Sequence, residues 1–389
     1  MKNDGILITH GTDTLAWTHA YLRYAIKNNN VNIVITGSQI PIPSIGEFSD
    51  AYENLENSLR FITGLKPPNI ITVFNYGKDA FSDSLRKIHR WDNIAFTGDV
   101  VAKMEWDEIK HHDETIEIKD PEVLDTLYLV TTGGTIESEP NSEGVLVASE
   151  NHVFAYLGRK FSSFFKAISQ QPVFVLDSSD ITFNRMMAIG EKVVECLQEK
   201  NKNAKIDYKF DDNVSIIYLD PLKKIHLKEH DINTASGVII AGYGGGNINI
   251  DNKDPKYNVI PLLKKLIENE VPVVLTSQVA LGPADFIYQN AYEALKIGAI
   301  SGVDLSIPEI QIRLAYLLGH KAEIKELAKE LNKHYLWMFE WIFVTGTKFR
   351  TRRSLALYQN LKKMDVLKED ILINKTFDET VDYIKKIIL

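Results

Sequence analysis

The stretch GILITHGTDTL, residues 5–15, decides the fold of this chain. Its apolar residues Ile6–Ile8 stop abruptly at a polar cluster, and a helical pattern of apolar residues begins at Leu15. A short, β-branched apolar run is typical of a buried strand in a parallel sheet. Because such sheets bind ligands beyond the carboxyl ends of their strands, the polar residues 12–14 are predicted to lie at a ligand site.

Two interpretations of this polar cluster are open from the residues alone. A hydroxyl or carboxylate at a helix start can cap the helix, and a cap needs only one such residue. The cluster here has five polar residues, and a glycine between them allows close backbone approach. The polar residues are Thr9, His10, Thr12, Asp13 and Thr14, and the glycine is Gly11. This surplus favours a functional site over a simple cap.

The composition is that of an ordinary soluble globular protein, with 44% hydrophobic and 25% charged residues. A length of 389 residues favours two domains with room for an appendage. The formal net charge of -8 argues against a general nucleic-acid binder. The single cysteine, Cys196, excludes an intramolecular disulfide framework and a cysteine-based zinc cluster, and its helical surroundings predict a core position.

The apolar segments are too short to act as membrane or export signals. The first residues lack the long apolar segment of a secretory signal, and no stretch reaches the roughly 18 apolar residues of a membrane span. We therefore expect a cytoplasmic protein without membrane contact.

Strand-like and helix-like segments alternate along the chain. Apolar runs at residues 31–36, 70–74, 126–130 and 173–176 each end at polar or glycine-rich residues. A helical pattern follows the first of these runs at residues 50–62. The alternation predicts an α/β fold with right-handed crossovers.

A polar segment at residues 200–212 lacks apolar periodicity and marks the predicted domain boundary. A second α/β unit follows it, and some 70 residues of mostly helical pattern lie beyond Gly319. The predicted parts are an N-terminal domain at 1–205, a C-terminal domain at 206–320 and a helical extension at 321–389.

Three predicted strands end in similar chemistry: Thr-Asp at 12–13, Gly-Gly-Thr at 133–135 and Ser-Ser-Asp at 178–180. Parallel strands place their carboxyl ends at one edge of the sheet, so the three segments can converge there. Hydroxyls, acids and glycines without paired His or Cys ligands suit hydroxyl nucleophile chemistry better than metal chemistry. Glycine-rich turns also supply backbone N–H groups that can stabilise an oxyanion.

Other motifs have ordinary structural interpretations beside functional ones. The Gly134-Thr135 turn can be a plain strand-to-helix turn, and Lys87 lies in a charged loop that is typical of solvated surface. The loop Gly242–Gly246 lacks the third glycine of a dinucleotide-binding loop, which argues against NAD. Asp50 and Asn54, four residues apart, are typical of a helix cap or an exposed face.

Together the motifs resemble the bacterial-type L-asparaginase family, closest to its cytoplasmic type I branch. Residues 5–15 match one active-site signature of that family in full, and Tyr128–Ile136 match most of the other. Further segments over residues about 5–320 have counterparts in the family: 35–41, 87–89, 177–180, 242–247 and 276–278. The resemblance implies a two-domain α/β fold, with a parallel-sheet N-terminal domain and a smaller α/β C-terminal domain.

The order of the motifs differs from the order that the family shows. In the family the Gly-Gly-Thr motif opens the chain, whereas here it follows the His-Gly-Thr-Asp-Thr segment. The chain therefore resembles an asparaginase whose N-terminal domain is circularly permuted, with residues about 110–125 as the new connector. Permutation is tolerated where the old ends and the new cut lie at the surface.

The resemblance implies a role for each matched residue. Thr135 corresponds to the nucleophile, and Thr12, Asp13 and Lys87 to a second, interacting triad. The expected substrate-binding residues are Ser178, Ser179, Gly134, Gly11 and Asn247. Ser178 would contact the substrate α-carboxylate, Asp13 could also hold its α-ammonium group, and Asn247 would come from a neighbouring subunit. The implied protein is a homodimer or homotetramer that hydrolyses a small amino-acid amide through an acyl-enzyme, without metal or organic cofactor. The net charge and the short apolar segments argue against nucleic-acid and membrane partners.

Two residues depart from the family pattern. Glu137 stands where the family has Ala, Gly or Ser, and Val145 stands where type I enzymes carry a Tyr on a loop. Valine cannot accept a proton, and loss of a general base typically costs ~10²–10⁴ in rate. Glu137, Glu143 and Tyr156 are possible replacements, and Glu137 could instead bind a cationic substrate group.

Three hypotheses follow from these observations. The first is an asparaginase-like amidohydrolase acting on asparagine or a related amide. The second is an amidase of the same mechanism acting on another substrate, such as tRNA-linked glutamine, with the basic segment 350–353 as its support. The third, motivated by Val145 and Glu137, is an amino-acid-binding protein with weakened catalysis.

Overall fold

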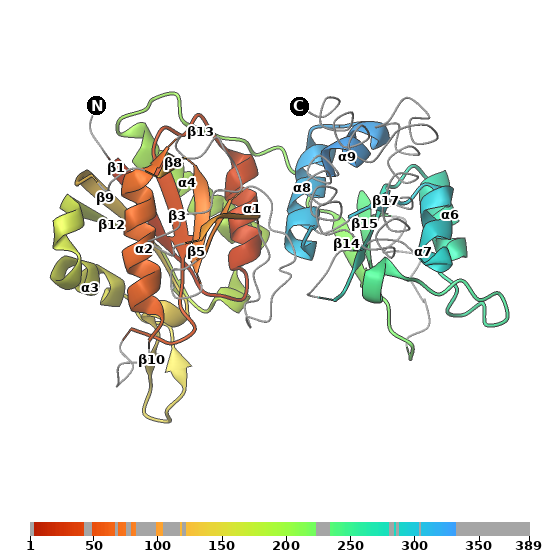
Figure 1. Ribbon diagram of the computed structural model, residues 1–389, viewed down its shortest axis with the longest axis horizontal. Helices are drawn as coiled ribbons and strands as arrows, with labels where there is room; N and C mark the ends of the chain where they lie inside the picture. Colours follow the sequence, from red (N-terminus) through yellow and green to blue (C-terminus); the bar gives the residue numbers. More distant parts are fainter. Residues whose placement is uncertain are drawn as a thin grey trace, which may run out of the picture. The chain divides into compact units, whose positions relative to one another are not determined.

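The computed structural model describes eleven segments of the chain. They are residues 4–42, 49–66, 69–74, 79–82, 99–103, 117–118, 122–222, 234–279, 284, 288–302 and 305–331. These residues form two compact units that divide between Tyr208 and Lys209 (Figure 1). Among the described residues, no helix is long and apolar enough to cross a bilayer.

The first unit is built on a seven-stranded sheet with the order β12-β9-β1-β3-β5-β6-β7. Its strands are β1 (Asp4–Thr9), β3 (Asn32–Thr36), β5 (Ile70–Phe74), β6 (Asp79–Ser82), β7 (Asp99–Lys103), β9 (Leu124–Gly133) and β12 (Phe165–Leu176). The five strands from β12 to β5 are parallel, and β6 and β7 extend the sheet in antiparallel fashion. The carboxyl ends of β12, β9, β1 and β3 therefore lie at one edge.

Helices cover both faces of this sheet (Figure 1). They are α1 (Leu15–Ala25), α2 (Ala51–Gly64), α3 (His152–Lys160) and α4 (Phe183–Gln198). Leu7 and Val34 share a buried cluster with residues of α2 and α3, while α1 packs against α4. Because both faces are covered, every residue of β1 and β3 is buried. The predicted buried strand and the predicted core position of Cys196 are both confirmed.

The predicted strand at 173–176 is only the end of a strand of twelve residues, β12. Its first half, FKAISQ, is too polar to stand out by apolar pattern. This composition fits the edge position of β12, which among the described strands pairs only with β9. The sequence therefore under-predicted this strand because its solvent-facing side needs no apolar residues.

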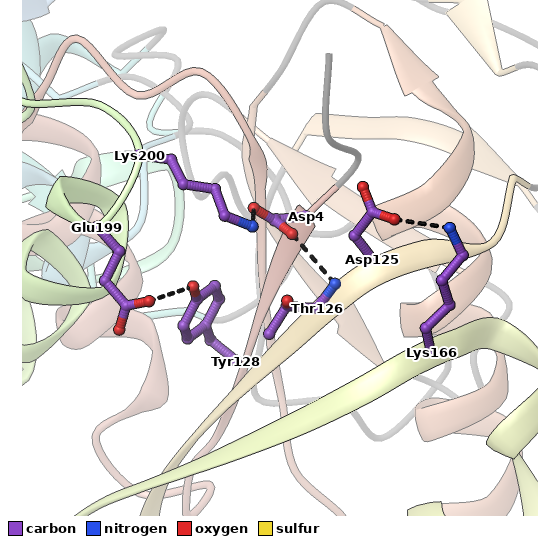
Figure 2. A network of polar contacts seen from close by, with 7 residues as sticks. All are labelled: Asp4, Asp125, Thr126, Tyr128, Lys166, Glu199 and Lys200. Carbon is purple, nitrogen blue, oxygen red and sulfur yellow. Dashed lines mark hydrogen bonds and ion pairs between the residues drawn. The ribbon is translucent and has the colours of Figure 1, made fainter.

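A polar network joins the amino-terminal ends of β1 and β9 (Figure 2). Asp4, which is 6% exposed, accepts a hydrogen bond from the Thr126 backbone N–H and forms an ion pair with Lys200. Tyr128 donates a 2.6 Å hydrogen bond to the Glu199 carboxylate. Glu199 and Lys200 both lie just beyond the end of α4. These contacts fix β9 beside β1, although the two strands are more than a hundred residues apart in the chain.

Short elements complete the first unit. The two-residue strands are β2 (Ile26–Lys27), β4 (Leu65–Lys66), β8 (Glu117–Ile118), β10 (Glu139–Pro140), β11 (Leu146–Val147) and β13 (Lys205–Ile206). The 3₁₀ turns are η1 (Thr135–Glu137), η2 (Ser162–Phe164) and η3 (Ser178–Asp180). Of these, η1 and η3 directly follow β9 and β12 at the carboxyl edge of the sheet.

The second unit has a smaller parallel sheet with the order β14-β15-β16-β17. Its strands are β14 (Val214–Tyr218), β15 (Gly237–Gly242), β16 (Val273–Ser277) and β17 (Ile300–Ser301). Its helical elements are η4 (Gly244–Gly246), α6 (Ile260–Glu268), α7 (Gln289–Ile297), α8 (Ile307–Gly319) and α9 (Ile324–Leu331). Separate apolar clusters join the sheet to α6 and α7 and to α8 and α9, which gives the predicted α/β layers. The rest of the predicted extension, 332–389, lies outside the described residues.

Candidate functional site

Three turns meet beyond the carboxyl ends of β1, β9 and β12, and two glycines let them touch. A Cβ on Gly134 would lie 2.4 Å from the Gly11 Cα, and a Cβ on Gly11 would lie 2.4 Å from the Ser178 Oγ. Gly134 also has a φ of 79°, which side chains rarely adopt. Larger residues at either glycine would push apart the turns that carry the predicted Thr-Asp, Gly-Gly-Thr and Ser-Ser-Asp segments.

Ser178 fastens its own turn to the turn of Asp13. Its Oγ accepts a 3.2 Å hydrogen bond from the Asp13 backbone N–H and lies 3.3 Å from the Asp13 Oδ2, to which it donates. The Thr14 hydroxyl donates a 2.7 Å hydrogen bond to the Ser178 carbonyl. Ser178 is buried, while Asp13 and Ser179 are exposed. The carboxylate of Asp13 is thus oriented by the protein and still reaches solvent.

Thr135 opens the turn η1 directly after Gly134. The Gly134 N–H donates to the Leu176 carbonyl at 3.0 Å, and the Ser138 hydroxyl donates to the Gly134 carbonyl at 2.9 Å. Thr135 and Thr12 are both partly exposed, each next to one of the touching glycines. Two threonine hydroxyls therefore belong to neighbouring turns at the same sheet edge as the Asp13 carboxylate.

His10 lies beneath the site and is completely buried. Burial lowers its pKa from 6.5 to about 4, although the neighbouring Gly11 carbonyl favours the charged form. The neutral ring then has one donor, and the Nδ1–H must serve the Gly11 carbonyl at 2.7 Å because that group can only accept. The Nε2 accepts from the Thr18 hydroxyl at 2.8 Å. His10 is thus a structural hydrogen-bonder that links the Gly11 turn to α1.

Asp50 and Asn54 organise the turn after β3, a role that the sequence interpretation missed. The Asp50 carboxylate accepts 3.0 Å hydrogen bonds from the backbone N–H groups of Gln39 and Ile40, and a third from the Asn54 amide. Asn54 also donates to the Gly37 carbonyl. Both side chains are buried, so neither forms an exposed face. The sequence did contain a signal for this role: two polar residues, Asp50 and Asn54, stand four positions apart directly after a polar turn.

Several predicted residues are not brought into this arrangement by the described structure. Lys87 lies outside the described residues. Asn247 belongs to the second unit, where its carbonyl accepts from the Tyr243 N–H at 2.8 Å beside η4. In the described part of the chain, no group of three or more His, Cys, Asp or Glu side chains is placed to hold a metal ion.

The two residues that depart from the family pattern, and the suggested replacements for the missing Tyr, lie in different environments. Val145 is 56% exposed and lies with Glu143 in the loop between β10 and β11. Tyr156 packs against the apolar core from α3 and contacts the ring of Phe161. Glu137, the last residue of η1, is completely buried, and burial raises its pKa from 4.5 to about 7.

Comparisons with known families match both units of the chain. Residues 1–115 match the model of the asparaginase N-terminal domain. Residues 213–331 match the model of the glutaminase/asparaginase C-terminal domain. The two matches lie in the same order as the two α/β units of the structure.

Individual relatives are distant in sequence, but their matches extend over most of this chain. An L-asparaginase of Thermococcus kodakarensis is 25% identical over 332 residues, which cover 85% of this chain and 74% of the relative. A glutamyl-tRNA(Gln) amidotransferase subunit of Methanobrevibacter smithii is 25% identical over 335 residues. That match covers 85% of this chain but only 58% of the relative, so the chain spans little more than half of it.

Solved structures agree with this assignment at the level of the fold. The thermostable L-asparaginase from Thermococcus kodakarensis superposes with a TM-score of 0.52 at 22% identity, covering 85% of this chain and 74% of that one. The sheet orders, the converging turns and the two matched domains thus have one common explanation: the chain belongs to the asparaginase family, with its two-domain fold.

Proposed function

We propose that this asparaginase-family protein hydrolyses the side-chain amide of L-asparagine, or of a related small amide, to the acid and ammonia. The observation that carries the proposal is the contact between Gly11 and Gly134, which joins the turns of Thr12 and Thr135. Family membership supports an amidohydrolase, and the partly exposed hydroxyl of Thr135 supports a nucleophile at this position.

The chemistry proceeds through an ester on Thr135. The Oγ1 attacks the amide carbon and loses its proton, the C–N bond of the tetrahedral intermediate breaks, and the nitrogen leaves as ammonia after receiving a proton. Water then attacks the ester carbon, which releases the acid and restores the hydroxyl. Backbone N–H groups of the glycine-rich turns stabilise the oxyanion in both steps.

Recognition of an amino acid is supported by the arrangement of Asp13 and Ser178. Asp13 presents an oriented, solvent-reaching carboxylate that suits an α-ammonium group, and Ser178 holds it in place. We assign Thr12 and Lys87 to proton transfer, and Ser179, Gly11 and Gly134 to contacts with the bound amide. We assign Asn247 to the site of a neighbouring protomer in a homodimer or homotetramer, and we place the protein in the cytoplasm.

We further propose that the first unit is a permuted asparaginase domain. The sheet order supports this, because β9 and β12 follow β7 in the chain yet lie on the opposite side of β1. The polar network around Asp4 supports it as well, because it fastens this later half of the domain to the earlier one.

A second candidate function is hydrolysis of a tRNA-linked glutamine amide. The similarity to a glutamyl-tRNA(Gln) amidotransferase supports it, at the same identity as the similarity to an asparaginase. A third is amino-acid binding with weakened catalysis, which the exposed Val145 supports because it offers no proton acceptor at the position of the expected Tyr.

The deciding experiment is ammonia release from the purified chain with asparagine, glutamine and other β-amides. Thr135→Ala should abolish turnover, whereas Thr182→Ala, an exposed threonine before α4, should leave it unchanged. Turnover that survives Thr135→Ala would contradict the proposed nucleophile. Ligand-induced thermal stabilisation without product, together with a gain of turnover in Val145→Tyr, would favour the binding protein. Light scattering with a size-exclusion column tests the oligomer.

A further inference from the structure

A fourth turn, residues 37–42, follows β3 at the same edge of the sheet as the turns of Thr12 and Thr135. This β3 turn touches the turn of Thr12 at Gly37, because a Cβ on Gly37 would lie 2.3 Å from the His10 carbonyl oxygen. A glycine is therefore needed for the backbone of the β3 turn to lie directly against the residues that lead into Thr12.

The β3 turn also reaches the turn of Thr135, through Ile42. The Ile42 N–H donates a 3.2 Å hydrogen bond to the carbonyl of Ile136, the residue directly after Thr135. The Ile42 side chain packs against the apolar cluster that contains Ile136, which is completely buried. The β3 turn is thus in contact with both turns that carry a candidate threonine hydroxyl.

The geometry of the β3 turn depends on Asp50, whose side chain is buried. Both of its carboxylate oxygens accept 3.0 Å hydrogen bonds from the Gln39 N–H, and Oδ1 accepts another from the Ile40 N–H at 3.0 Å. The Asn54 side chain, on α2, donates from its Nδ2 to the Asp50 Oδ2 and to the Gly37 carbonyl, both at 3.0 Å. Asp50 and Asn54 therefore fix the backbone of the turn at three successive residues.

Asp50 stands directly before α2, where a carboxylate would ordinarily cap the helix. The hydroxyl of Ser49 serves the first helical N–H instead, because it accepts from the Ala51 N–H at 3.2 Å. The Asp50 carboxylate is directed at Gln39 and Ile40, which lie 11 and 10 residues earlier in the chain. Hydrogen bonds to a carboxylate are stronger than those between neutral groups, so this acceptor is suited to hold the turn in one geometry.

We propose that Asp50 is a positioning residue of the site: by holding the β3 turn, it sets the separation between the turns of Thr12 and Thr135. Such a separation matters because a displacement of about 1 Å in a catalytic group can cost ~10² in rate. The effect on catalysis rests on the proposed amidohydrolase, whereas the hold on the turn does not.

Amide hydrogen exchange tests the hold without any assay of activity. Asp50→Asn keeps the size of the side chain but turns one acceptor oxygen into a donor, which then faces the N–H groups of Gln39 or Asn54. Exchange under native conditions should become about ten-fold faster in the β3 turn and in η1. The amides that report it are those of Ile42, Glu137 and Ser138, which donate to Ile136, Gly134 and Thr135. Glu53→Gln, at an exposed acid in the first turn of α2, should leave them unchanged.

A matched variant separates this role from a general loss of stability. Asn32 is also buried and lies on the same strand, β3, but at its opposite end. Its side-chain amide donates to the Ile62 carbonyl on α2, and its Oδ1 accepts from the Asn69 N–H, both at 3.0 Å. Asn32→Ala should therefore weaken the same strand and helix without faster exchange in η1 relative to the rest of the first unit.

Steady-state kinetics test the consequence for the reaction. Asp50→Asn should lower kcat about ten-fold with little change in KM, because Asp13 is oriented by the turn after β12 rather than by the β3 turn. Ile42→Pro, which removes the N–H that donates to Ile136, should lower kcat in the same way. Ile42→Ala, which keeps this N–H, should lower kcat less, and Asn32→Ala should keep the native kcat.

The outcomes separate a positioning residue from a structural one. Unchanged exchange in η1 or a native kcat in Asp50→Asn would overturn the proposal, and so would an equal loss of kcat in Asp50→Asn and Asn32→Ala. Should Asp50→Asn fail to fold, the comparison of Ile42→Pro with Ile42→Ala decides the same question. A native chain without turnover, in which Asp50→Asn still speeds exchange in η1, would sink the proposed function and leave the hold on the turn standing.

Discussion

His10 and Glu137 are two completely buried polar residues in the turns of the candidate site, and their surroundings are opposite. Both ring nitrogens of His10 have partners, the Gly11 carbonyl and the Thr18 hydroxyl. Neither carboxyl oxygen of Glu137 has a regular hydrogen bond among the described residues. Burial acts on both, but it keeps the histidine neutral by lowering its pKa and keeps the acid neutral by raising its pKa.

The difference shows that burial of a polar side chain can support the fold, as at His10, or cost stability, as at Glu137. A neutral, fully bonded His10 costs the fold little and fixes the Gly11 turn. Glu137 weakens the fold whenever it ionises, because its charge is taken out of water without a full set of donors. A residue that costs stability beside a candidate nucleophile is better explained by function than by packing.

The largest expected effect is a pair of opposite pH slopes in stability. Glu137 has a folded pKa of about 7 against 4.5, so the folded state holds its proton longer than the unfolded state. The contribution of Glu137 to the free energy of unfolding is complete below pH 4.5. It is lost as the pH rises to 7, by roughly 3 kcal/mol. His10 has a folded pKa of about 4 against 6.5, so its contribution is complete above pH 6.5 and is lost on acidification, also by roughly 3 kcal/mol.

Single variants should expose each slope, because the two largely cancel between pH 4.5 and 6.5 in the native chain. Urea unfolding of Glu137→Gln should show stability that rises with pH over this window, and His10→Gln should show stability that falls. The unfolding of the first unit must be monitored with a probe that reports on that unit alone, since two units need not unfold together. Identical slopes in the two variants would contradict the contrast between the residues.

The contrast also shows how far the sequence could predict the molecule. The parallel sheet was predictable because β1 and β3 are uninterrupted apolar runs, and the three converging turns followed from the shared edge. The length of β12 was not, because an edge strand needs no apolar pattern. The environment of Glu137 was not either, because α3, which packs against η1, lies beyond a hairpin in the chain and shares no local periodicity with η1.

A third buried polar residue should behave like His10. The Asp50 carboxylate accepts hydrogen bonds from the Gln39, Ile40 and Asn54 nitrogens. Asp50→Ala should destabilise the first unit by about 2–3 kcal/mol, because the hydrogen bonds that these three nitrogens make to a buried carboxylate are lost together. Chemical denaturation measures the change, and Glu53→Ala, at an exposed acid in the first turn of α2 just after Asp50, is the matched control with an expected change within about 0.5 kcal/mol. Equal effects of the two variants would show that the Asp50 hydrogen bonds contribute nothing specific.

The smallest expected effect comes from making His10 resemble Glu137. Thr18→Val keeps the shape of the buried Thr18 side chain and removes the hydroxyl that donates to the His10 Nε2. The ring then has one unsatisfied nitrogen, which should cost about 1–2 kcal/mol of stability. The Nδ1–H bond to the Gly11 carbonyl should survive, because the neutral ring still has a single proton and that carbonyl can only accept. Nitrogen NMR of the His10 ring should therefore show the same tautomer in Thr18→Val as in the native chain. A ring that instead carried its proton on Nε2 would show that Thr18, rather than the Gly11 carbonyl, sets the state of His10 and through it the turn of Thr12.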